Sequence, residues 1–76
     1  MPRHRRSPAW LSEDMAYALA AMCPPLTPAD IEHAAHRLTV HGRSTEVTGH
    51  LLRSGADLMR VRRLVEALRA LRDLQP

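Results

Sequence analysis

The sequence predicts an all-α protein, a small bundle of about four helices. Apolar residues recur every three or four positions in four successive segments, and no segment shows the sustained alternation typical of a strand. The core must be built from Leu, Val, Met and Ala, because there is one Trp, one Tyr and no Phe. Such small or unbranched side chains favour helices. With 76 residues, we expect one domain at 8–76 after a flexible basic arm at 1–7.

The first predicted helix has two candidate starts and a clear end. Ser7 followed by Pro8 can begin a helix, and so can Ser12, which is followed by two acidic residues. The prolines at 24–25 end the helix, because proline lacks the backbone donor and clashes with the preceding turn. The predicted apolar stripe of this helix consists of Leu11, Met15, Ala18, Leu19 and Met22.

The second predicted helix has the clearest start in the chain. Thr27 is its cap, Pro28 its first residue, and Asp30 lies in the first turn. Gly42 is the expected end. The apolar stripe of this helix consists of Ile31, Ala34, Ala35 and Leu38.

The third predicted helix is short, roughly 45–54, with Ser44 as its cap and Gly55 as its end. Val47, Leu51 and Leu52 are expected to point inward. Gly49 lies in the middle, where glycine costs about 1 kcal/mol relative to alanine. This glycine therefore either permits a close approach or marks a weak helix.

The fourth predicted helix, about 57–74, is the longest and most amphipathic. Leu58 and Val65 belong to its apolar side, together with a set at coiled-coil spacing. That set consists of Val61, Leu64, Leu68 and Leu71. We expect it to form the interface of a homodimer or to bind another partner.

The charges are segregated along the chain. All 11 basic residues are arginines, and the formal net charge is +3. Residues 9–36 contain four acidic residues and no arginine, whereas the part from Arg37 onward contains eight arginines. Arginine suits phosphate and carboxylate partners. The segregation indicates two faces with different partners, or one face meeting the other in a dimer.

No motif for catalysis, a metal or a cofactor is present, so the sequence indicates a protein that is not an enzyme. Cys23 lies at a helix end, where the dipole disfavours a thiolate. His33 and His36 have a spacing that two ligands of one metal can have, but a polar helix face explains it more simply. One cysteine and no membrane-length apolar run favour a cytoplasmic protein without a membrane partner.

Binding to DNA is the strongest functional hypothesis. The second predicted helix, a short turn and the third predicted helix follow one another as in a helix-turn-helix motif. The second helix of that motif enters the major groove of DNA. The residues expected at base edges are Ser44, Thr45, Thr48 and Gly49, and those expected at phosphates are Arg43 and Arg53. The arm would follow the minor groove through Arg3, Arg5 and Arg6. This pattern predicts a small transcriptional regulator.

The alternative hypothesis is a non-catalytic protein-interaction module, such as an adaptor, antitoxin or inhibitor. It would dock through the apolar stripe of the fourth helix or through the first helix. Trp10 and Tyr17 are seven residues apart, which places both on one helical face. Aromatic side chains serve as interface anchors, although so few aromatics also suit the core.

Two stretches resemble known families without completing either pattern. Residues 41–42 and 50–58 resemble part of the tyrosine recombinase catalytic domain. Ser44 and Thr45 stand at the positions of that family's catalytic arginine and frequent histidine, and no nucleophilic tyrosine follows. The resemblance therefore implies no recombinase activity. The stretch 51–57 also looks like the end of an ankyrin repeat, but no second repeat is present. A leucine-rich helix ending in a left-handed glycine, with a new cap at Asp57, accounts for both likenesses.

Overall fold

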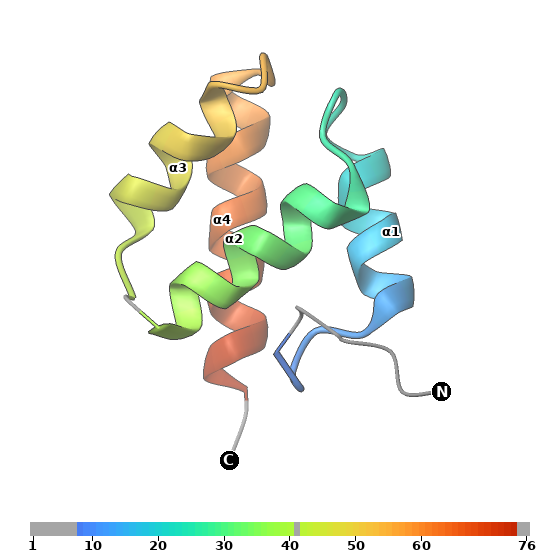
Figure 1. Ribbon diagram of the computed structural model, residues 1–76, viewed down its shortest axis with the longest axis vertical. Coiled ribbons are helices and arrows are strands. Elements are labelled where there is room, and N and C mark those ends of the chain that lie inside the picture. The colour runs from blue at the N-terminus through green and yellow to red at the C-terminus, as the bar shows by residue number, and fades with distance from the viewer. Residues whose placement is uncertain (1–7, 41, 75–76) are drawn as a thin grey trace.

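The computed structural model describes residues 8–40 and 42–74, and it is all-helical over these ranges (Figure 1). The helices are α1 (Glu13–Ala21), α2 (Pro28–Val40), α3 (Ser44–Leu52) and α4 (Leu58–Asp73). The predicted fold class is therefore confirmed. The predicted arm at 1–7 lies outside the described residues.

Side-chain caps set the beginnings of three helices. The Ser12 hydroxyl accepts a hydrogen bond from the backbone N–H three residues on, at 3.1 Å, so α1 starts at the second of its two predicted caps. Thr27 and Asp30 bond reciprocally, with the Thr27 N–H donating to the Asp30 carboxylate at 2.8 Å and the Asp30 N–H donating to the Thr27 hydroxyl at 3.3 Å. Asp57 caps α4 in the same manner as Ser12 caps α1. Each cap satisfies backbone donors that a helix start leaves without a partner, which is worth about 1 kcal/mol.

The start of α3 differs from its prediction. Arg43 occupies the cap position with an extended backbone, and its side chain makes no capping hydrogen bond. Ser44, the predicted cap, is instead the first helical residue, and its carbonyl accepts a hydrogen bond from the Thr48 hydroxyl at 2.8 Å. The helix also ends at Leu52, about half a turn earlier than predicted. α3 therefore lacks the stabilisation that a side-chain cap gives the other three helices.

Both predicted helix-ending glycines have the backbone that only glycine adopts readily. Gly42 has φ +69° and Gly55 has φ +90°. A side chain there would crowd the following carbonyl, so these positions are reserved for glycine. The Gly55 N–H donates to the Leu52 carbonyl at 3.0 Å and closes the last turn after α3.

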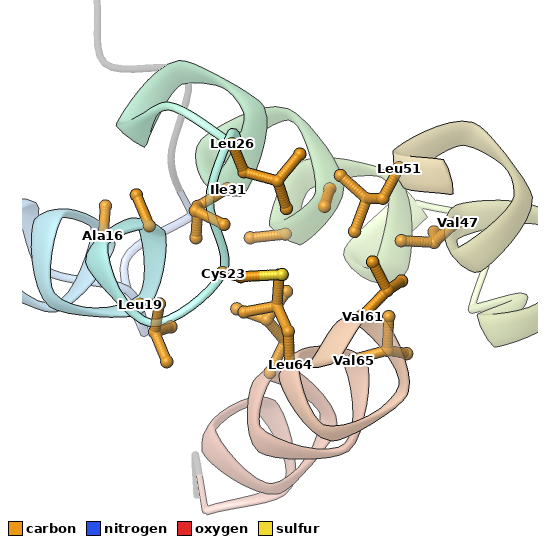
Figure 2. Packing of buried hydrophobic residues seen from close by; sticks show 14 of the residues in the cluster. Ala16, Leu19, Cys23, Leu26, Ile31, Val47, Leu51, Val61, Leu64 and Val65 are labelled. Carbon is orange, nitrogen blue, oxygen red and sulfur yellow. The ribbon is translucent and has the colours of Figure 1, made fainter. Parts of the chain in front are cut away.

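The core lies where α2 crosses the other three helices (Figures 1 and 2). α4 faces the core in two directions: Val61 and Val65 lie beside α3, and Leu64 lies beside Cys23 at the end of α1. The described side chains of the core, all nearly inaccessible to solvent, are Leu11, Ala16, Leu19, Ala20, Cys23, Leu26, Ile31, Ala34, Ala35, Leu38, Val47, Leu51, Ala56, Val61, Leu64, Val65 and Leu68. Burying each of the larger ones contributes about 1.5–3 kcal/mol.

The predicted stripe of α1 was partly wrong. Leu11 and Leu19 are buried as expected, but the other three members, Met15, Ala18 and Met22, are exposed. The helix instead buries the alanines at 16 and 20 against α2, which buries two alanines of its own. Small side chains on both helices let their backbones approach closely, so the larger methionines point elsewhere.

The two aromatic residues do not share a surface. Trp10 precedes α1, packs against the core, and donates from its indole nitrogen to the Thr39 hydroxyl at 3.1 Å. Tyr17 points outward from α1 and is 63% exposed. The idea of a joint aromatic docking face therefore fails, because only Tyr17 is on a helix and Trp10 serves the core.

Candidate functional site

α2 and α3 are consecutive helices joined by three residues, and α3 lies at the outer edge of the molecule (Figure 1). Val47 and Leu51 fix its inner face against α2 and α4. The opposite face of α3 is open to solvent. This is the element that sequence reasoning selected as the reader of DNA.

Some of the predicted contact residues are exposed on α3, and others are half-buried. Arg43, Thr45 and Arg53 are exposed. Ser44 and Thr48 are half-buried, and the Thr48 hydroxyl is engaged with the helix's own backbone. Thr45 is therefore the predicted base-contacting side chain that is best placed to reach a ligand. Arg3, Arg5 and Arg6 lie outside the described residues.

Gly49 also lies on this exposed face, one helical turn from Thr45 and one from Arg53. A Cβ built at Gly49 would meet no atom within 4 Å from the described residues outside its own stretch of helix. No neighbouring element therefore requires glycine here, and the helical backbone does not require it either. The first of the two explanations from the sequence, a close approach, does not apply inside the described part of the chain.

Sequence reasoning missed two residues of this face, Glu46 and His50. The Glu46 carboxylate accepts from Arg37 of α2 at 3.2 Å. The rings of His50 and His33 lie 5.2 Å apart between the same helices. Placing the third helix on a helical wheel would have found both residues, because Glu46 is one turn from His50 and His50 is one turn from Arg53. This cluster ties α3 to α2 at the surface, where such an ion pair is worth less than about 1 kcal/mol.

The histidine pair considered for metal binding is not arranged for it. The Nε2 atom of His33 accepts a hydrogen bond from the Arg37 Nε at 3.3 Å, and that lone pair is the one a metal would need. His36 is exposed on the same helix. Among the described residues, no three His, Cys, Asp or Glu side chains are grouped so as to hold a metal ion.

The predicted interface set of α4 lies mostly inside the chain. Val61, Leu64 and Leu68 are buried in the core, and Leu71 is half-buried against it. These side chains have almost no solvent-accessible surface that a partner could contact. A dimer through them would require α4 to leave the core, so they no longer serve as the candidate interface.

A different apolar surface is open beside α4. A groove of about 510 Å³ lies between the end of α1 and the first half of α4. Met22 and Met59 line it, and they are 68% and 60% exposed; Arg60 and Arg63 lie on its α4 side. Arg60 links α4 to the end of α1 by donating to the Met22 carbonyl at 3.3 Å. The groove exists because α1 packs on α2 and α3 packs on α4, which leaves α1 and α4 apart.

Cys23 also lines this groove, but its side chain is almost entirely buried. Burial raises the pKa of the thiol, the nearby Arg60 charge lowers it, and Asp57 raises it, with a net upward shift. The thiol is therefore protonated at neutral pH, and a protonated thiol is a poor nucleophile.

No protein-family model, curated protein or solved structure matches the chain. Within the described ranges, no helix is both long and apolar enough to cross a membrane. A functional hypothesis must therefore rest on the two surfaces themselves, the exposed face of α3 and the α1–α4 groove.

Proposed function

We propose that this protein is a small, non-catalytic DNA-binding protein that acts as a transcriptional regulator, with α3 as the helix that enters the major groove. One observation carries the proposal: Thr45, Gly49 and the C-cap residue Arg53 lie on the exposed face of α3, and this glycine has no packing role among the described residues.

A glycine that costs stability and serves no internal contact is well suited to an external one. A helix approaches a groove wall more closely where it has no side chain. Thr45 then reaches base edges with a small hydroxyl, while Arg43 and Arg53 contact the phosphates on either side. Neither arginine side chain makes a hydrogen bond or ion pair to another described residue, so both guanidinium groups are available.

The arm would add Arg3, Arg5 and Arg6 as minor-groove or phosphate contacts. The net charge of +3 favours association with DNA in general, whatever its sequence. Cytoplasmic location is part of the same proposal.

The test is binding to random-sequence duplex DNA at two salt concentrations, measured by fluorescence anisotropy. Affinity that falls steeply as salt rises is expected, because each neutralised phosphate releases counterions. Arg43→Ala should weaken binding to all sequences and reduce the salt slope by about one. Arg43→Lys is the matched control, since it keeps the charge and should retain most of the affinity. No detectable binding at low salt would refute the proposal.

The second candidate function is a protein-interaction module, and the methionine-lined groove is the observation that favours it. Methionine is flexible and polarisable, and it is common on surfaces that accept helices. Under this alternative, Met22→Glu abolishes capture of a partner from the native host, while Arg43→Ala has no effect.

A further inference from the structure

We infer that the α1–α4 groove is the interface of a homodimer in which α1 of each copy lies in the groove of the other. This inference does not rest on DNA binding, because its residues are separate from those of α3. It relocates the dimer interface from the buried seam of α4 to the exposed surface beside it.

The first observation is an apolar strip on α1 that is exposed in the single chain. Met15, Ala18 and Met22 are all exposed and lie on one side of the helix, with successive spacings of three and four residues. All three methionines of the described residues, at 15, 22 and 59, are at least 38% exposed. Exposed methionines concentrated along one helix and its neighbouring groove are typical of a docking surface.

The second observation is that the strip can pack against the same strip of a second copy that runs in the opposite direction. α1 has nine residues, so it is about 13 Å long. In a two-fold dimer with the α1 helices antiparallel, Met15 of one copy faces Met22 of the other. Ala18 then lies near the axis, where its small side chain lets the two helices approach closely. Each copy uses the same patch, as a closed dimer requires.

The third observation is the arrangement of charge. α1 begins with Glu13 and Asp14, while Arg60 and Arg63 flank its end. Asp14 and Met22 are separated by about 12 Å along the helix, so the acids and the arginines lie at opposite ends of the strip. The antiparallel two-fold arrangement brings Asp14 of each copy to the arginines of the other, whereas Glu13 lies on the opposite side of α1. The charges of this chain are therefore complementary to those of a second copy of itself, whereas nothing in the chain specifies complementarity to a helix of another protein.

The experiment is sedimentation equilibrium of the full chain, with circular dichroism to confirm that each variant is helical. The wild type is expected to be dimeric, and Met22→Glu monomeric, because the charge is placed in the apolar contact. Tyr17→Glu is the matched control: it adds the same charge to α1 at a side chain that is 63% exposed and does not line the groove. It should leave the dimer intact.

Charge reversal gives a test that does not depend on apolar burial. Asp14→Arg and Arg63→Glu should each raise the dissociation constant of the dimer at least about tenfold, because each places like charges together. The double variant should recover most of the wild-type affinity. A wild-type chain that stays monomeric up to millimolar concentration would overturn the inference. A dimer that survives Met22→Glu would overturn it as well, and so would failure of the double variant to recover. DNA binding of the wild type can be measured whichever result is found.

Discussion

Replacing Gly49 by alanine separates the stability of α3 from its proposed role. Gly49 lies in the middle of a nine-residue helix, and a Cβ there would meet no atom within 4 Å from the described residues beyond this part of the helix. No contact is lost and no clash is made, so the helix propensity decides the outcome. Gly49→Ala should stabilise the fold by about 0.5–1 kcal/mol. For a domain of this size, that raises the melting temperature by roughly 2–8 °C.

Gly55→Ala is the control, because it makes the same change with the opposite expected sign. Its Cβ would also meet no atom within 4 Å from the described residues other than its chain neighbours, but its φ is +90°. An L-residue in a left-handed conformation costs about 1–2 kcal/mol, so Gly55→Ala should lower the melting temperature. Thermal unfolding followed by circular dichroism measures both. A Gly49→Ala variant that is less stable than the wild type would refute the conclusion that this glycine has no internal role.

The same variant then addresses function. If α3 approaches DNA through Gly49, the added methyl group should weaken binding even though the protein is more stable. Anisotropy titrations of the wild type and Gly49→Ala at one salt concentration give the comparison. Unchanged or tighter DNA binding would show that the glycine does not mark the contact face.

Three further predictions address charge, the thiol and the core. Glu46→Gln should tighten binding to random-sequence DNA, because it removes a negative charge from the face of α3. Glu66→Gln makes the same change at an exposed residue of α4 and should have a smaller effect. Equal effects in anisotropy titrations would indicate that only the net charge of the protein matters. Cys23 should react slowly with a disulfide reagent in the native state and rapidly in urea, because its side chain is buried. Since the pKa of this thiol is raised in the folded protein, the stability that it contributes is full below the unfolded pKa of about 8.5 and is lost as the pH rises. Chemical denaturation of the wild type and Cys23→Ala between pH 7 and 10 shows whether the wild type alone loses this contribution. Leu68→Ala should destabilise the fold by about 2–5 kcal/mol because Leu68 is fully buried, and a loss below 1 kcal/mol in the same assay would contradict that burial.

Local signals in the sequence predicted most of the fold. The Thr27 and Asp57 caps and the glycines at 42 and 55 are recognisable because each depends on a few neighbouring atoms. The start of α3 was misplaced by one residue, because Ser44 suits a cap by type but its hydroxyl is not used as one. The N-cap preference of an amino acid indicates which residues are suitable as a cap, whereas the packing of the helix determines where its first turn begins.

Packing between helices was less predictable, and that limited the candidate sites. Periodicity on α1 is ambiguous because alanines at 16 and 20 are as regular as the methionines beside them. Only the crossing with α2 shows that the alanines face inward. On α4, the coiled-coil spacing of Leu64 and Leu68 was real but serves the core of the single chain. The sequence identified the apolar faces, and the fold determined which of them remained exposed.

The two proposed surfaces lie on different parts of the molecule, because α2 separates α1 from α3 (Figure 1). A dimer through the groove therefore leaves both copies of α3 open, and two copies on one duplex contact about twice as many phosphates as one. Since the salt slope scales with the number of neutralised phosphates, the monomeric Met22→Glu variant should show about half the wild-type slope. Tyr17→Glu adds the same charge and keeps the dimer, so it should retain the full slope. Equal slopes for the wild type and Met22→Glu would mean that one copy makes all the DNA contacts, and the dimer would then need another role.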